Sequence, residues 1–165
     1  MCMEMAGENK LEKAFDLGYE KFLKKEFLRI NVPDLPPYFR EFTKVKFKPK
    51  QIVDRILLSK RKSIAFELKN TKRKLIPLTR IKKHQTEFLK EFKEKVGESY
   101  YLFGFNDFKC VFGVDIDVFL EMRRTLTKKS FNMKDIKTLN HIEIEIKKLR
   151  TNYRMNLSKF SSYFL

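Results

Sequence analysis

The chain has 165 residues, of which 42% are hydrophobic, so it is long enough to form one domain with a substantial core. Its 37 Lys and Arg residues exceed its 21 Asp and Glu residues and give a formal net charge of +16 at pH 7, which favours nucleic acid as the partner and an anionic membrane surface as the second choice. The two cysteines, Cys2 and Cys110, are too few and too far apart to form a zinc site or a disulfide framework.

The first ten residues, MCMEMAGENK, lack the apolar segment of a signal peptide, and Glu4 lies among them. No later run reaches the ~18 consecutive apolar residues that a membrane span needs. We therefore expect a cytoplasmic, nucleoid-associated protein with no membrane partner.

The region that follows contains an amphipathic pattern and then a break. Apolar residues spaced three and four apart, from Leu11 to Phe27, predict a helix over residues 8–29. Three prolines in the stretch NVPDLPPYF end that helix. Residues 42–47 are predicted to form a short strand.

The middle of the chain predicts a hairpin and a second helix. Residues 52–58 and 63–70 alternate as strands do, and the polar stretch SKRK between them marks the turn. Residues 81–96 have helical spacing, and Gly97 follows that helix as a C-terminal cap.

The last third continues the mixed pattern. Residues 99–105 and 109–114 predict two strands around Asn106-Asp107, and residues 115–124 predict a helix. An acid, Asp115 or Asp117, is expected to begin this helix, because acids favour the first turn.

The C-terminal segment is less regular. Residues 141–148, HIEIEIKK, fit either a late edge strand or an amphipathic helix. We expect a single α/β domain over residues 1–150 and a basic, aromatic tail over residues 151–165. This tail is expected either to wrap around DNA or a dimer partner, or to be mobile.

Two acids stand out in the predicted hairpin. Between Lys44 and Lys83 there are fifteen basic residues and only Asp54 and Glu67 as acids. If the hairpin turns between Lys60 and Arg61, the two acids lie directly opposite one another, with Cβ atoms roughly 4.5–5.5 Å apart.

Two carboxylates that close repel each other unless a cation neutralises them, and Mg²⁺ typically binds to one or two carboxylates, waters and phosphate. Lys69 shares a strand face with Glu67, where it could orient a water, assist its deprotonation or stabilise charge that develops on a phosphate. A Glu and a Lys two residues apart are common on solvated strands, but the opposing Asp54 and the scarcity of other acids favour phosphodiester hydrolysis.

The pattern Asp54, then Glu67-Leu68-Lys69, resembles the PD-(D/E)XK nuclease superfamily. The segment IAFELKNTK, followed by IPLTRIKKHQ and YYLFGFNDFKCVFGV, is similar to RecU-type Holliday-junction resolvases. Within this pattern, Pro77-Leu78 and His84-Gln85 are more specific than the common Glu-x-Lys.

This resemblance implies a restriction-endonuclease-like fold, with a mixed central sheet flanked by helices. It implies a homodimeric, Mg²⁺-dependent endonuclease, with Mn²⁺ as a possible substitute, that resolves four-way DNA junctions in recombination and repair. Asp54 and Glu67 would bind the metal together with the carbonyl of Leu68, Lys69 would be the catalytic lysine, and Gln85 would project into the site. A glutamate on the first helix would be a further metal ligand, with Glu12 as the candidate and Glu8 as the alternative.

Thr71 and six basic residues around these positions are predicted to contact DNA phosphates; the alternative is that they form a solvated basic loop. The basic residues are Lys72, Arg73, Lys74, Arg80, Lys82 and Lys83. His84 is expected to be structural or solvated, whereas Gln85, on an apolar helix face, needs a polar partner.

Two alternatives remain beside the resolvase. One is another nuclease of the superfamily that acts on duplex, flap or end substrates. The other is a non-catalytic DNA-binding protein, in which the charge alone provides the function.

Overall fold

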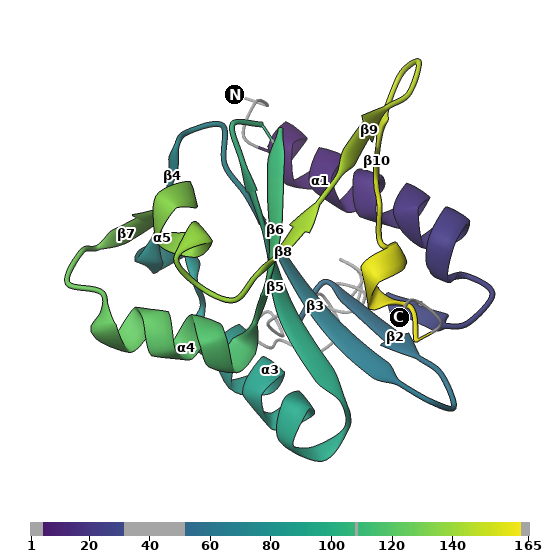
Figure 1. The fold of residues 1–165 in the computed structure, drawn as a ribbon, viewed down its shortest axis with the longest axis horizontal. Helices are drawn as coiled ribbons and strands as arrows, with labels where there is room; N and C mark the ends of the chain where they lie inside the picture. The colour runs from purple at the N-terminus through teal and green to yellow at the C-terminus, as the bar shows by residue number, and fades with distance from the viewer. Residues whose placement is uncertain (1–4, 32–51, 108, 163–165) are drawn as a thin grey trace, which may run out of the picture.

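The computed structural model describes residues 5–31, 52–107 and 109–162, and the predicted strand at 42–47 lies outside these ranges. Figure 1 shows a central sheet with helices on both of its faces. The strands of this sheet, in spatial order, are β1 (Leu28–Asn31), β2 (Arg55–Leu58), β3 (Ser63–Asn70), β5 (Glu98–Phe105), β6 (Cys110–Asp115) and β8 (Ile142–Ile144).

The sheet is mixed, because β3 and β5 are parallel and the other neighbouring strands are antiparallel. Two further pairs join β4 (Leu75–Pro77) to β7 (Ser130–Asn132) and β9 (Ile146–Lys148) to β10 (Tyr153–Met155). The expected mixed sheet flanked by helices is confirmed.

Each face of the sheet buries its own hydrophobic cluster. One cluster lies beneath helix α1 (Met5–Gly18) and the π-helical turn η1 (Tyr19–Leu23), with Phe15 and Phe66 at its centre. The other lies beneath the helices of the opposite face, with Phe103 and Phe119 among its buried rings. These helices are α3 (Lys83–Lys95), α4 (Ile116–Thr125) and α5 (Met133–Lys137), and the 3-10 turn η2 (Leu78–Arg80) precedes α3.

Most elements predicted from periodicity are confirmed, including both strands of the hairpin and the helix after it. The turn between β5 and β6 contains Asn106 and Asp107 with φ of 52° and 57°, the left-handed conformation that Asn and Asp tolerate in hairpins. Asp115 caps α4, because its carboxylate accepts a hydrogen bond of 2.9 Å from the Asp117 N–H.

The predicted helix over residues 8–29 is too long. The helical backbone ends with η1, and residues 28–31 instead form edge strand β1 against β2. The Tyr19 hydroxyl donates a 2.8 Å hydrogen bond to the Phe27 carbonyl, which stabilises the turn back toward the sheet. Strand pairing therefore overrides the predicted helix at Leu28 and Arg29.

The C-terminal segment is folded against the first cluster. Strand β8 lies at the edge of the sheet, as one of the two alternatives predicted, and β9 and β10 form a hairpin after it. Met155, Leu157 and Phe160 are buried; Phe160 belongs to the 3-10 turn η3 (Ser158–Phe160). The division into a domain at 1–150 and a tail at 151–165 stays a prediction.

Within the described ranges, none of the helices has the length and apolar character needed to cross a membrane.

Candidate active site

The two acids of the hairpin meet as the sequence predicts. Strands β2 and β3 are antiparallel and pair Arg55 with Phe66 and Leu58 with Ser63. This register, continued by one residue, places Asp54 across from Glu67. The Leu68 N–H donates a 2.7 Å hydrogen bond to Asp54 Oδ2, which fixes the Asp54 carboxylate against β3.

Alternation along β3 determines which side chains face the site. Ile64, Phe66 and Leu68 pack in the cluster beneath α1. Glu67 and Lys69 therefore project from the opposite face, and both are buried, with 1% and 8% of their surface exposed. Lys69 Nζ lies 2.6 Å from Glu67 Oε1, so the two charges neutralise one another in a site shielded from water.

The acids lie in a polar cleft of about 390 Å³. Of the residues that the structure describes, eight line it, all of them predicted site residues: Glu12, Asp54, Glu67, Leu68, Lys69, Arg80, Lys82 and Gln85. Gln85 comes from the first turns of α3 and is 7% exposed, and its Oε1 atom has no hydrogen-bond partner in the part of the chain that the structure describes. An oxygen acceptor left buried in this way favours a water or ligand in the cleft.

The remaining predicted DNA-binding residues lie outside the cleft. Thr71 is buried and belongs to a turn, because its hydroxyl accepts a 3.1 Å hydrogen bond from the Arg73 N–H. Lys72, Arg73 and Lys74 are exposed after β3. Lys83 lines a neighbouring hollow that it shares with Lys82, His84 and Glu87.

Burial changes the acidity of Asp54. Desolvation raises its pKa from 3.8 to about 6, the nearby Glu12 carboxylate adds to the rise, and the hydrogen bond from Leu68 together with the charges of Lys69 and Arg55 opposes it. The site therefore holds a carboxylate whose charge is poorly compensated at neutral pH. A bound cation would relieve this cost.

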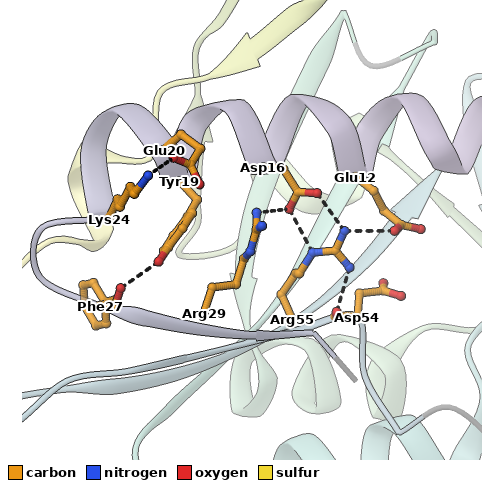
Figure 2. A network of polar contacts seen from close by, with 9 residues as sticks. All are labelled: Glu12, Asp16, Tyr19, Glu20, Lys24, Phe27, Arg29, Asp54 and Arg55. Atoms are coloured by element: carbon orange, nitrogen blue, oxygen red, sulfur yellow. Dashed lines mark hydrogen bonds and ion pairs between the residues drawn. The ribbon is translucent and has the colours of Figure 1, made fainter. Parts of the chain in front are cut away.

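Glu12 reaches the cleft from α1, and Arg55 holds it there. Figure 2 shows the Arg55 guanidinium between the helix and strand β2. It donates to Glu12 Oε2 at 3.1 Å and to both carboxylate oxygens of Asp16 at 2.9 and 3.1 Å, while its Nη1 donates to the Asp54 carbonyl at 2.8 Å. Arg29 binds the same Asp16 carboxylate at 2.9 Å.

The network around Arg55 was not predicted from the sequence. A signal was nevertheless present, because the segment IVDRILL places Arg55 on the same strand face as the apolar Leu57. A cation on a buried face needs an acid partner, and Asp16, one helical turn after Glu12, is correctly spaced to provide it.

The side chains of the cleft offer oxygen atoms as ligands for a metal ion. In the described ranges, no three or more His, Cys, Asp or Glu side chains are close enough together to hold a metal ion. Glu12 is directed to Arg55, which leaves Asp54 and Glu67 as the close carboxylate pair. Because Mg²⁺ commonly binds through one or two carboxylates, water and substrate phosphate, the oxygen donors present fit such an ion.

Comparison with known proteins finds a family that matches most of the chain and, among solved structures, a similar nuclease. The family model described as Recombination protein U, RecU, matches residues 9–159. Among solved structures, the Holliday junction resolvase Hjc from the archaeal hyperthermophile Archaeoglobus fulgidus is similar, with 15% sequence identity and a TM-score of 0.47 over 73% of this chain and 87% of that chain. A search of curated proteins finds no significant match.

The raised pKa of Asp54 predicts a specific dependence of stability on pH. The folded chain binds a proton on Asp54 below about pH 6, whereas the unfolded chain does so only below 3.8, so this group lowers stability as pH rises through that window. Asp54→Asn keeps the acceptor for Leu68 and removes the charge. In EDTA at pH 7.5 it should raise the free energy of unfolding by up to about 3 kcal/mol, and the gain should fade near pH 4.

Thermal unfolding at several pH values measures this effect. Glu143→Gln, which changes an exposed carboxylate, is the control and should leave Tm unchanged at each pH. A lower Tm for Asp54→Asn at pH 7.5, or a gain that is the same at pH 4, would contradict the assignment.

The Arg55 network predicts strong coupling between α1 and β2. A double-mutant cycle of Asp16→Asn and Arg55→Gln should give a coupling energy of about 1–3 kcal/mol, because the pair is bidentate and the Arg55 side chain is buried. The matched control is the exposed pair Glu20 and Lys24, 2.7 Å apart on the same segment, which should give about 0.5 kcal/mol or less. Equal coupling in the two cycles would show that Arg55 does not hold the helix to the strand.

Proposed function

Because the chain belongs to the RecU family, whose members are DNA endonucleases that resolve Holliday junctions, we propose that the cleft around Asp54 and Glu67 is its catalytic centre and uses Mg²⁺. The observation that carries this proposal is the pairing of β2 with β3, which brings Asp54, Glu67 and Lys69 into one buried, polar cleft. Resolvases of this kind need divalent metal ions, and Mg²⁺, with Mn²⁺ as a substitute, is the specific proposal.

Asp54 and Glu67 would bind the ion, and the Leu68 carbonyl, which belongs to the residue between Glu67 and Lys69, would add a neutral oxygen. When bound, the ion supplies positive charge at the scissile phosphate and promotes deprotonation of the attacking water. Glu12 is the proposed third carboxylate. It lines the same cleft, where its Oε2 atom accepts a hydrogen bond from Arg55.

Lys69 is the proposed catalytic lysine. Its ammonium group forms an ion pair with Glu67, so the lysine side chain is already held where the phosphate would react. From there it orients the attacking water and stabilises the negative charge that develops on the phosphate oxygens. Gln85 contributes an amide from α3, whose buried oxygen can accept a hydrogen bond from that water.

The surrounding cations would hold the DNA backbone. Arg80 and Lys82 line the cleft, while Lys72, Arg73, Lys74 and Lys83 lie exposed beside it. Phosphate contacts of this kind fix the position of the duplex without reading its sequence. Thr71 belongs to this proposal through its turn, which presents the three basic residues that follow it.

The proposed assembly is a homodimer. A four-way junction is resolved by cutting two strands, and each chain has one catalytic cleft, so two chains provide the two cuts. Dimers are typical of these resolvases. A DNA substrate also supports the proposed location in the cytoplasm at the nucleoid.

Cleavage of a synthetic four-way junction tests the catalytic residues. With Mg²⁺ the protein should make paired, symmetric nicks, and EDTA should abolish them. Asp54→Asn, Glu67→Gln and Lys69→Met should each lower the cleavage rate by more than roughly 10²-fold while junction binding persists, because each removes a charge that the reaction needs.

Two controls make this experiment decisive. Glu94→Gln changes an exposed carboxylate on α3 and should cleave at the wild-type rate. Linear duplex of the same sequence should be cut far more slowly than the junction. Tight junction binding without cleavage, or cleavage that survives the Asp54 and Glu67 substitutions, would overturn the proposal.

A further inference from the structure

The hairpin of β9 and β10 is rich in positively charged residues. It extends from Ile146 to Met155, and its cations are Lys147, Lys148, Arg150 and Arg154. None of the four forms an ion pair within the described ranges. In Figure 1 the hairpin projects past α1 and away from the central sheet.

The base of this hairpin is rigidly anchored. Met155 is fully buried, and a Cβ atom added to Gly18 of α1 would lie 2.5 Å from the Met155 carbonyl oxygen, so the helix and the strand are in close contact. After the hairpin, the Phe160 ring packs edge-on against Phe66 at 5.0 Å. The Ser162 N–H then donates a 3.0 Å hydrogen bond to Glu26. The hairpin is therefore a fixed projection.

The strand register separates its two faces. Met155 pairs with Ile146, and both side chains pack on the core, whereas Arg154 pairs with Lys147 on the other face. These two cations line a cleft of about 440 Å³ together with Lys21 of η1. Three cations thus face one hollow, and no acid of the described ranges forms an ion pair with any of them.

Among the described residues, one acid lines this cleft. The Glu145 carboxylate accepts a hydrogen bond of 3.4 Å from the Asn156 side chain. The Asn156 N–H also donates to the Glu145 carbonyl at 2.9 Å. Because three cations line the hollow and only this one acid opposes them, the hollow is net positive, which suits a phosphate.

We propose that the hollow formed by Lys21, Lys147 and Arg154 is a second phosphate-binding site, which binds the DNA backbone outside the catalytic cleft. This inference rests on the proposed function, because its ligand is the DNA of that reaction. A two-stranded ribbon such as β9–β10 is also narrow enough to enter a major groove, which would bring Arg150 at its tip to further phosphates.

The test is the salt dependence of junction binding in EDTA, where no cleavage occurs. The variant Lys147→Gln/Arg154→Gln removes the two paired cations. Two lost phosphate contacts should weaken binding about tenfold or more and lower the slope of log Kd against log salt by roughly two. With Mg²⁺ and saturating enzyme, the cleavage rate should remain that of the wild type, because neither residue lies in the catalytic cleft.

Lys129→Gln/Lys134→Gln is the matched control. It removes the same charge from exposed residues around β7 and α5, on the opposite face of the sheet. This variant should keep the wild-type slope. An unchanged slope in the hairpin variant, or an equal loss in the control, would overturn the inference.

The outcome is separable from that of the proposed function. If the wild type cleaves junctions and the hairpin variant binds them normally, the second site is wrong and the catalytic assignment stands. If no protein cleaves but the slope falls only in the hairpin variant, the phosphate site stands and the catalytic assignment fails.

Discussion

The antiparallel pairing of β2 with β3 is the constraint on which the site depends. A shift of the register by one residue would turn Glu67 and Lys69 into the hydrophobic cluster beneath α1 and expose Phe66. The large rings on one face of β3 therefore determine where its charges lie. The Leu68 N–H adds a second restraint, because it holds the Asp54 carboxylate against the strand that carries Glu67.

The same arrangement makes the site unfavourable for the folded chain in the absence of a cation. Burial raises the pKa of Asp54 to about 6, and Glu12 adds negative charge nearby. Arg55 offsets part of this cost, since it joins Glu12 and Asp16 to the strand that carries Asp54. The network thus stabilises the contact of α1 with the sheet and holds a candidate ligand ready beside the pair.

Much of this could be predicted from the sequence, because short-range patterns determine it. The turn at SKRK defined which residues of the hairpin face one another, and the spacing of Gln85 on an apolar helix face indicated its place in the cleft. The end of the first helix could not be predicted, since residues 28–31 become a strand only by pairing with β2. The anchoring of the C-terminal segment depends equally on distant contacts, such as Phe160 with Phe66.

The positive charge of the chain divides into two groups with different roles. Lys69 and Arg80 are engaged inside the protein, the first with Glu67 and the second with the Asn70 carbonyl at 2.7 Å, so they position the cleft. Among the described residues, Lys147 and Arg154 form no ion pair with an acid, and they lie on the hairpin that projects past α1. A cation held by a contact within the fold meets a phosphate only at the place where that contact keeps it, whereas these two cations can each pair with a phosphate of the DNA backbone. Much of the affinity for DNA should therefore come from outside the catalytic cleft, which allows the cleft to be optimised for the reaction itself.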